Sequence, residues 1–365
     1  MLPMPLILGA LCATGFYTGV FPKDMIVTAN MIAVGTIAFH VLVVHSGTLI
    51  DLSLIRSHWR DALICLTGAL LLTPAIALGL RGIVGRELAL IAPGCVVGGG
   101  ASCAIASRFV MDKAPALSVF PWMAFMVQGL FCVPLTTFAL KKESGALLSC
   151  LRDGRVDAAT TASPLPQPEP AALCGRLPAA YKTTAYYLVT VLAVSVCNRY
   201  LHALLPEGWR LNLNVTALLL GFAFGRLGLL EKGPLFRSDS YGLLLLGLMG
   251  LFANTIANNT AANLLRLLPP LLLVFAVSTA VLAFTGIVMA KIMGCRPWRG
   301  IILTMNCMMG FPVNRMLVQN ASSIGANETE RAFLTAQLSP LLGVGTMLIS
   351  NAISILMVSI SVNLI

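Results

Sequence analysis

Apolar runs of about 20 residues recur along the whole chain and are separated only by short polar clusters. As a helix, a run of that length spans the hydrocarbon core of a bilayer, which is about 30 Å thick. Of the 365 residues, 58% are hydrophobic and 10% are charged, and the mean hydropathy is +0.88. A soluble domain carries roughly 25% charged residues, so the composition excludes that class. The sequence predicts an all-α integral membrane protein in contact with the lipid bilayer.

The net charge of +10 fits a membrane protein better than a nucleic-acid-binding protein. The 24 Lys and Arg residues are spread over short loops between apolar runs, as expected from the bias of basic residues toward the cytoplasm. Most of the ten cysteines lie inside apolar runs, without a CxxC motif or a Cys/His pair at metal-ligand spacing. We therefore expect no nucleic acid partner and no cofactor.

A proline-rich segment at 141–182 divides the chain into two apolar halves. Its five prolines and several charges preclude a membrane span, which predicts a linker. The halves, 1–140 and 183–365, are then two membrane domains. Candidate spans lie at 4–21, 27–50, 61–84, 88–108, 116–140, 183–204, 212–229, 240–264, 268–293, 299–319 and 332–362.

The two halves share an ordered set of features. GCVVGGGASCAI at 94–105 aligns with NCMMGFPVNRML at 306–317, which places Cys95 on Cys307 and Gly98 on Gly310, an offset of 212 residues. The same offset aligns the helices that follow, at 124–134 and 336–346. Repeated halves with interrupted segments at matching positions are typical of secondary transporters and indicate their binding site. The alternative is a chance alignment of two glycine-containing apolar helices.

The charge distribution orients the chain but does not choose between two topologies. If the interrupted segments near 88–110 and 299–320 are re-entrant hairpins, nine spans remain and matched spans run in opposite directions. One side then carries 15 basic residues and the other 8. The same division results if both segments cross the membrane, so inversion of the repeats alone favours hairpins. The linker is cytoplasmic in both topologies.

The first interrupted segment is predicted to form a substrate-binding tip. Three consecutive glycines break a helix and leave backbone groups without helical partners. At membrane depth such backbone survives only if it is buried in protein or lines a cavity. The alternative is a close helix-packing site made of small residues. The candidate substrate-binding residues of this tip are Gly98, Gly99, Gly100, Ala101 and Ser102.

The second interrupted segment contains a break and a charge. A proline directly follows Gly310-Phe311 and breaks the helix at the position of the glycine triplet. Arg315 is a full charge within this segment, where it costs a few kcal/mol unless it is paired or solvated. We expect it to receive a substrate carboxylate in a bidentate manner; the alternative is that it lies close enough to water to need no partner. The candidate substrate-binding residues are Gly310, Pro312, Asn314 and Arg315.

Amide and hydroxyl groups are concentrated at the end of the 240–264 span. Such groups supply neutral oxygen ligands for sodium, although hydrogen bonding between neighbouring helices explains them equally well. No acidic residue occupies the middle of a span, which favours sodium over protons as the coupling ion. Asp51, in the first half, either binds an ion or caps a helix. The candidate sodium ligands are Asn254, Thr255, Asn258, Asn259 and Asn306.

Three stretches together resemble a known family. GTLIDLSLIRSHWRDALICLTGALLL, GCVVGGGASCAIASRF and MAFMVQGLFCVP are similar in order to segments of the bacterial sodium/glutamate symporters, which belong to a wider superfamily with the 2-hydroxycarboxylate symporters. Gly98, Gly99 and Gly100 match the first glycine-rich tip of that family, and Gly310 matches the second. The resemblance implies an elevator transporter of the bacterial cytoplasmic membrane, commonly a homodimer, with two inverted repeats and two oppositely inserted hairpins.

The predicted function is therefore sodium-coupled transport of a small anionic metabolite, either a glutamate-like amino acid or a di- or hydroxycarboxylate. An anion exchanger or a bile-acid-type carrier of the same superfamily is the alternative within this class. An enzyme is not expected, because the chain has no HExxH motif, no GxSxG motif and no intramembrane aspartate pair. A channel is also less favoured, because twin interrupted segments at repeat-related positions are typical of alternating access.

Overall fold

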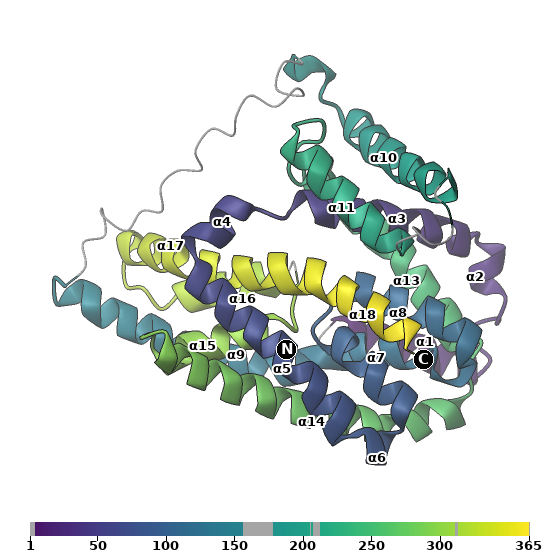
Figure 1. Ribbon diagram of the computed structural model, residues 1–365, viewed down its shortest axis with the longest axis horizontal. Coiled ribbons are helices and arrows are strands. Elements are labelled where there is room, and N and C mark those ends of the chain that lie inside the picture. The colour runs from purple at the N-terminus through teal and green to yellow at the C-terminus, as the bar shows by residue number, and fades with distance from the viewer. Residues whose placement is uncertain (1–3, 156–177, 205, 207–211, 311–312, 365) are drawn as a thin grey trace.

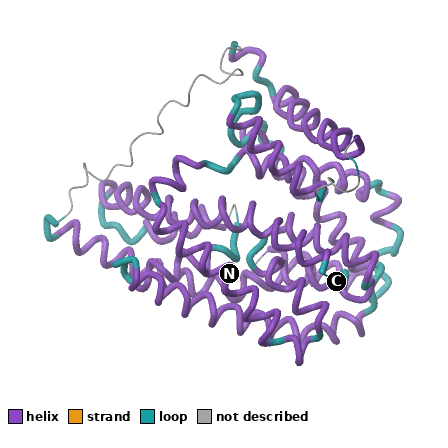
Figure 2. Tube along the Cα trace, viewed as in Figure 1, coloured by secondary structure: helices purple, strands orange, loops and turns teal. Residues whose placement is uncertain are grey.

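The computed structural model describes residues 4–155, 178–204, 206, 212–310 and 313–364. These residues form helices joined by loops and contain no strand (Figure 2). Six helices are long and apolar enough to cross a membrane, and shorter apolar helices lie among them. The prediction of an all-α, multi-pass membrane protein is confirmed at this level.

The helices follow one another along the chain as labelled in Figure 1. The first half contains α1 (Met4–Tyr17), α2 (Met25–Thr28), α3 (Met31–Thr48), α4 (Leu52–Ser57), α5 (Trp59–Gly79), α6 (Arg81–Val84), α7 (Arg86–Val96), α8 (Gly100–Lys113), η1 (Pro115–Leu117) and α9 (Phe120–Arg152). The second half contains η3 (Ala179–Tyr181), α10 (Thr184–Leu204), α11 (Leu213–Arg226), α12 (Pro234–Arg237), α13 (Tyr241–Ala257), α14 (Ala261–Ile292), α15 (Pro297–Asn306), α16 (Val313–Ser322), α17 (Glu328–Gly345), the π-helix η5 (Thr346–Ile353) and α18 (Ser354–Asn363).

The helices pack as two groups, which we call the panel and the core. The panel consists of α1, α3, α10, α11 and α13, and within it α3 packs along both α11 and α13. The core consists of α5, α7, α8, α9 and α14 through α18 with η5, and within it α14 packs against α5, α9 and α15. Figure 1 shows α3, α10 and α11 together at the upper right, whereas α9, α14 and α15 lie along the lower side.

A glycine pair brings the backbones of α3 and α11 into contact within the panel. A Cβ atom on Gly47 would lie 2.3 Å from Leu218 O, and one on Gly221 would lie 2.1 Å from Val44 O. No side chain fits at either position, so the two helices pack at a distance that only small residues permit. This contact joins α11, from the second half of the chain, to α3 from the first.

The end of α9 and the beginnings of α15 and α17 lie together at one end of the core, which we call the linker side. Arg152, the last residue of α9, makes two hydrogen bonds of 2.9 Å to Glu330 in the first turn of α17. Arg296, directly before α15, places Nη2 3.1 Å from the Sγ atom of Cys150. Since α15 and α16 lie between these two contacts in the chain, this interrupted helix enters and leaves on the linker side.

The other interrupted helix enters and leaves at the opposite side. The Arg86 guanidinium, at the start of α7, donates to Leu364 O at 3.4 Å. Leu364 lies at the far end from the linker side, because α17, η5 and α18 form one continuous rod about 50 Å long. Beyond α8, Ala116 O accepts a hydrogen bond of 2.8 Å from Asn263 in the first turn of α14, whose last turn precedes Arg296. The two interrupted helices thus enter from opposite ends.

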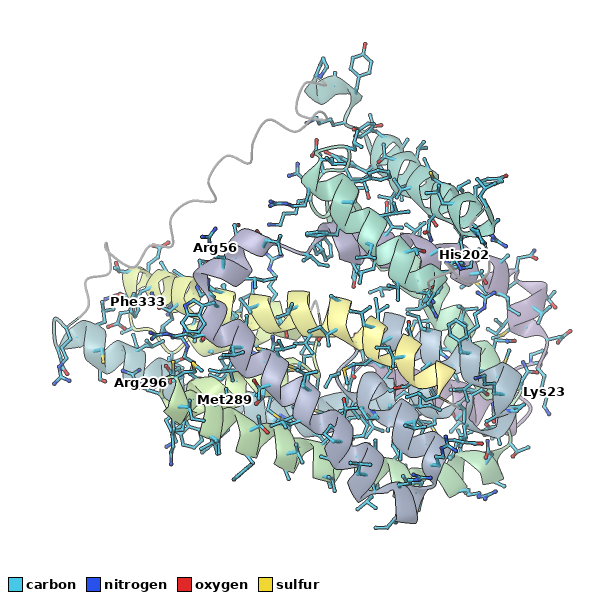
Figure 3. The ribbon with its side chains drawn as sticks, in the orientation of Figure 1. Lys23, Arg56, His202, Met289, Arg296 and Phe333 are labelled. Atoms are coloured by element: carbon cyan, nitrogen blue, oxygen red, sulfur yellow. The ribbon has the colours of Figure 1, made fainter. Side chains whose placement is uncertain are left out.

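A buried ion pair fixes α15 to α5 near the linker side. Arg299 forms two hydrogen bonds to Asp61, Nε to Oδ1 at 3.0 Å and Nη2 to Oδ2 at 2.7 Å. The Asp61 side chain is only 2% exposed. Arg296 adds a contact of 3.5 Å to Glu143 on α9, and Figure 3 shows Arg296 at the same end of the molecule as Arg56 and Phe333. One arm of the second interrupted helix is therefore fixed to both of its neighbours.

Two element boundaries differ from those expected. The helix α9 continues to Arg152, past the predicted limit at residue 140, because residues 141–152 contain no proline and bury Ser144 and Leu148. The predicted span at 240–264 ends earlier, at Ala257, because Thr260 caps a new helix by accepting a hydrogen bond from Asn263 N. The prolines at 269 and 270 lie inside α14 and do not end it.

We expect Asp61→Ala to lower the free energy of unfolding strongly. Removing one partner of a buried pair leaves the other charge uncompensated, at a cost of about 3–5 kcal/mol. The control is Asp153→Ala, since Asp153 and Arg155 are exposed and 3.8 Å apart, and such pairs contribute about 1 kcal/mol at most. Denaturant titration of the purified protein in detergent measures both changes. Equal effects of the two substitutions would contradict the conclusion that the Asp61–Arg299 pair fixes α15 to α5.

Candidate functional site

The first interruption lies between α7 and α8 and depends on glycine. Gly99 directly precedes α8 in an extended conformation (φ −90°, ψ −167°), and its carbonyl accepts a hydrogen bond from Cys103 N at 3.2 Å. A Cβ atom on Gly98 would lie 2.4 Å from the Cβ atom of Ser102 and 2.6 Å from Gly94 O. A side chain at Gly98 would therefore push the two arms apart. Gly100 is the first residue of α8, and the backbone of Ala101 follows it in the first turn.

The second interruption begins where α15 ends, at Asn306. The next turn is closed by Met308 N and Met309 N, which donate to Met305 O and Asn306 O at 3.0 Å each. A Cβ atom on Gly310 would have no atom of the described residues within 4 Å apart from those of its chain neighbours. Helix α16 begins at Val313. Pro312, which the sequence places in this tip, lies outside the residues that the structure describes.

Two serines of the last helix connect the two tips. The Ser350 hydroxyl lies 2.9 Å from Cys307 O and 3.0 Å from Met309 O in the second tip. The Ser354 hydroxyl lies 2.7 Å from that of Ser102 in the first tip. Ser350 and Ser354 are one helical turn apart, about 6 Å along the axis, and both are buried. The two interruptions therefore meet on one turn of the rod formed by α17, η5 and α18.

The rod has π-helical geometry where it meets the tips. The π-helix η5 covers Thr346–Ile353 and includes Ser350. π-helical turns inside α-helices are rare and frequently mark functional sites, because they free backbone groups from the regular i to i−4 pattern. The interruption of α7–α8, the interruption of α15–α16 and η5 are thus three departures from regular helix at one place.

Two asparagine side chains of the second tip share one acceptor and leave their oxygens free. Asn306 Nδ2 donates to Leu342 O at 2.5 Å, and Asn314 Nδ2 donates to the same carbonyl at 3.4 Å and also contacts the Thr346 hydroxyl. The carbonyl can only accept, which fixes the orientation of both amides. Within the part of the chain that the structure describes, Asn306 Oδ1 and Asn314 Oδ1 are buried without a hydrogen-bond partner. Unpaired buried oxygens are typical of a water or ion site.

Arg315 is the third residue of α16 and its side chain is exposed. Among the described residues, no hydrogen bond or ion pair to its guanidinium is found. The adjacent residue Asn314 lies at the free amide oxygens. A cation without a protein partner next to the tip can receive the carboxylate of a ligand.

The other four predicted sodium ligands lie away from Asn306. Asn254, Thr255, Asn258 and Asn259 lie at the end of α13 in the panel, toward the opposite side. Their amides bind within the cluster: Asn258 Nδ2 donates to Asn254 O at 2.9 Å and to Asn254 Oδ1 at 3.1 Å, and Asn259 Nδ2 donates to Thr255 O at 2.9 Å. No hydrogen bond among the described residues joins this cluster to Asn306, so the five residues do not form one cluster.

Asp51 acts as a helix cap, which was one of its two interpretations. Its carboxylate accepts from Ser53 N at 2.9 Å and from Leu54 N at 3.2 Å, at the start of α4. It also pairs with Lys232. Burial raises the pKa of Asp51, but hydrogen bonds from Lys232, Ser53 and Leu54 outweigh this effect and lower the pKa to about 2. Asp51 thus fixes a loop on the linker side.

The residues missed by sequence reasoning are those of the last helix. Thr346, Ser350 and Ser354 bind both tips, but the segment was interpreted only as part of an apolar span at 332–362. Their spacing of four residues places all three on one face of a helix. That stripe of hydroxyls is the signal that could have identified the partner of the two tips.

The lowered pKa of Asp51 predicts that this residue contributes to stability in a pH-dependent way. Its pKa in the folded protein is lowered to about 2 from 3.8, so the pair with Lys232 contributes fully above pH 3.8 and is lost as the pH falls toward 2. Asp51→Asn keeps a capping side chain but removes the charge. We expect the unfolding temperature of the wild type to exceed that of the variant at neutral pH and the difference to shrink below pH 3.8. A difference that is constant with pH would contradict this assignment.

Comparison with known proteins assigns no family. No protein-family model matches the sequence. No curated protein matches it either. The function is therefore inferred from the geometry of the two tips.

Proposed function

We propose that this protein is a sodium-coupled secondary transporter of a small anionic metabolite, a glutamate-like amino acid or a di- or hydroxycarboxylate. One observation carries the proposal. Two helices are interrupted inside the apolar core, enter it from opposite ends, and have their tips held by Ser350 and Ser354 on one helical turn. Interrupted helices that meet between repeated halves are the usual substrate sites of secondary transporters.

The packing of the core supports an inverted repeat. At the offset of 212 residues, α5 corresponds to α14, α7–α8 to α15–α16, and α9 to the rod formed by α17, η5 and α18. The helices α5 and α14 pack against each other, α8 packs on α9 as α16 packs on α17, and α7 packs on α18 as α15 packs on α9. Corresponding helices thus make corresponding contacts while their interrupted segments enter from opposite ends. This is the relation expected of two halves related by an axis in the membrane plane.

The anion would bind between the beginnings of the two outgoing half-helices. Helix α8 has no side-chain cap at its first turn, so its backbone N–H groups and the positive end of its dipole are available to a carboxylate. Helix α16 contributes the Arg315 guanidinium, which can bind a carboxylate through two parallel hydrogen bonds. Ser102 positions the first tip by its hydrogen bond to Ser354. The substrate would be small because the two tips are separated by one turn of the rod.

Sodium would bind at the free amide oxygens of the second tip. Asn306 is the last residue of α15, so Asn306 Oδ1 lies at the negative end of a half-helix dipole. Asn314 Oδ1 belongs to the same cluster, because both amides share Leu342 O as acceptor. Neutral oxygens at a half-helix C-terminus are the ligands that bind sodium in interrupted-helix transporters. We therefore assign sodium to Asn306 and Asn314 and not to the α13 cluster.

The proposed mechanism moves the core against the panel. Both tips belong to the core, whereas α3 and α13 of the panel contact α8 beside them. A core that slides along the panel exposes the tips to one side of the membrane at a time. In the topology expected from the sequence, 15 of the 24 basic residues lie on the side of the linker, which supports a cytoplasmic location for the linker. Helix α10 exposes apolar residues such as Leu192 and Val196, and we assign this surface to lipid or to a second copy in a homodimer.

Uptake by proteoliposomes tests the proposal. We expect accumulation of one anion from a labelled panel of glutamate, aspartate, citrate and malate when an inward sodium gradient is imposed. Without sodium the accumulation is lost, because an empty cation site leaves the second tip unsatisfied. Exchange that needs an internal counter-substrate but no sodium would instead identify an anion exchanger. No movement of any anion under either condition, with folded protein, would contradict transport of this substrate class.

Two asparagine variants serve as a matched pair in the same assay. Asn306→Ala removes a free oxygen at the second tip and is expected to raise the sodium concentration for half-maximal uptake by about tenfold, the equivalent of 1.4 kcal/mol. Asn258→Ala removes an exposed amide of the α13 cluster and is expected to leave that concentration unchanged. If Asn258→Ala raised that concentration and Asn306→Ala did not, the sodium site would be assigned to the end of α13 instead.

A further inference from the structure

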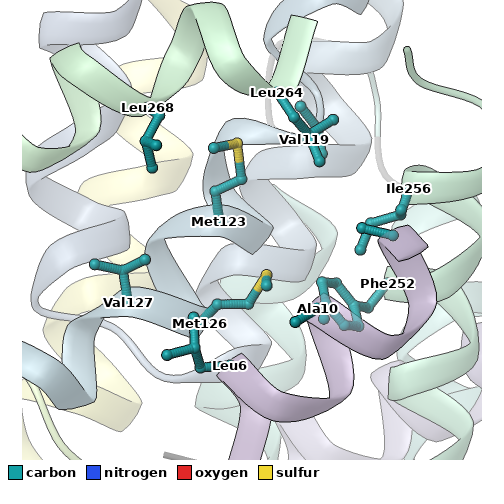
Figure 4. Close-up of a pocket in the computed structure, with 12 residues that line it drawn as sticks. Leu6, Ala10, Val119, Met123, Met126, Val127, Phe252, Ile256, Leu264 and Leu268 are labelled. Carbon is teal, nitrogen blue, oxygen red and sulfur yellow. The ribbon is translucent and has the colours of Figure 1, made fainter. Parts of the chain in front are cut away.

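An apolar cavity lies away from the two tips. It has a volume of about 140 Å³ and is lined by side chains of α1, α9, α13 and α14 (Figure 4). All residues that line it are apolar, and they include Ala10, Ala13, Met123, Met126, Phe252 and Leu268. Neither the predicted substrate residues nor the predicted sodium ligands contribute to its wall.

The cavity lies between the panel and the core. Helices α1 and α13 belong to the panel, and α9 and α14 belong to the core. It lies in the half of the molecule near the opposite side, because Leu268 and Met123 are in the first two turns of α14 and the first turn of α9. There the Tyr17 hydroxyl at the end of α1 donates to Ile256 O at 3.2 Å. The two groups of helices therefore leave a gap next to a point where α1 is fixed to α13.

The cavity continues toward the outer surface of α1. A second hollow, lined by Leu6, Ile7, Ala10, Leu11 and Thr14, shares Leu6 and Ala10 with the first. The outer face of α1 is apolar, and Leu11 is 59% exposed. In a multi-pass membrane protein, an apolar helix with such a face is in contact with acyl chains. The route into the cavity therefore starts at the hydrocarbon of the bilayer.

The size and lining of the cavity select its occupant. An apolar cavity of about 150 Å³ stays dry and accepts benzene or xenon, because water finds no polar partners in it. Hydrocarbon is the abundant apolar material at this depth. We propose that the cavity holds part of an acyl chain of a phospholipid from the leaflet on the opposite side, which enters around α1 past Ala10.

This occupant would touch both moving parts of the protein. The consequence for transport depends on the proposed function, whereas binding of the chain does not. If the core moves against the panel, the walls supplied by α9 and α14 shift relative to those supplied by α1 and α13. Binding of the acyl chain and the position of the core are then linked, since a ligand that fits one arrangement better shifts the equilibrium toward it.

Fluorescence of Trp122 reports on the cavity directly. Trp122 is 1% exposed, and its ring centroid lies 5.6 Å from that of Phe252 in the cavity wall. Replacement of the other three tryptophans by phenylalanine leaves Trp122 as the single tryptophan. The protein is then reconstituted in phosphatidylcholine vesicles with brominated or unbrominated acyl chains. Because bromine quenches tryptophan only at short range, we expect a loss of emission in the brominated vesicles despite the burial of Trp122.

Variants of α1 provide the matched controls. Ala13→Phe fills the cavity and is expected to restore the emission to its level in unbrominated vesicles, and Ala10→Leu is a smaller substitution with the same expected result. Leu8→Phe adds bulk to α1 outside the cavity wall and is expected to leave the quenching unchanged. Equal emission of the single-tryptophan protein in both vesicles, or equal quenching of Ala13→Phe and Leu8→Phe, would overturn the proposal. Neither result depends on uptake.

Discussion

The two hydroxyl groups of Ser350 and Ser354 satisfy the backbone and side chains of helices that break inside an apolar environment. A broken helix exposes carbonyl and amide groups, and hydrocarbon offers them no partner. Ser350 shares its one hydroxyl hydrogen between Cys307 O and Met309 O, and the Ser354 hydroxyl hydrogen-bonds with that of Ser102. Each tip is thus stabilised by a neighbouring helix in addition to its own backbone hydrogen bonds. Since both serines lie on the same turn, the break of one helix is positioned relative to the break of the other.

The ends of the interrupted helices are fixed differently from their tips. On the linker side, the pair Arg299–Asp61 attaches the first turn of α15 to α5, and the pair Arg152–Glu330 attaches the first turn of α17 to α9. The tips contain neutral groups only, apart from Arg315. Charge pairs thus lie at the ends of the interrupted helices, and hydroxyls and amides lie at the tips, where a ligand would bind and leave. Asn306 and Asn314 leave free oxygens among these neutral groups. A charged side chain paired with them would remain bound and would exclude a ligand from the site.

Much of the fold follows from local sequence signals, and the site follows from them only in part. The glycine triplet at 98–100 marks the first interruption because no neighbouring packing can compensate three glycines in a helix. The expected span at 240–264 runs past the end of α13, because the helix ends where the Thr260 hydroxyl accepts a hydrogen bond from Asn263 N, and hydropathy does not reveal that bond. The hydroxyls of the last helix were missed because serine in an apolar helix commonly bonds to its own backbone, and only the tertiary structure shows what else Ser350 contacts.

Opposite entry of the two interrupted helices is the central claim, and sided labelling tests it most directly. In a background without the ten native cysteines, Ser323→Cys lies just beyond α16 and Ala116→Cys lies just beyond α8, both at exposed positions. A membrane-impermeant maleimide is added to right-side-out and to inverted vesicles. The account predicts that each cysteine reacts in only one type of vesicle and that the two react in different types. Reaction of both cysteines from the same side would contradict it.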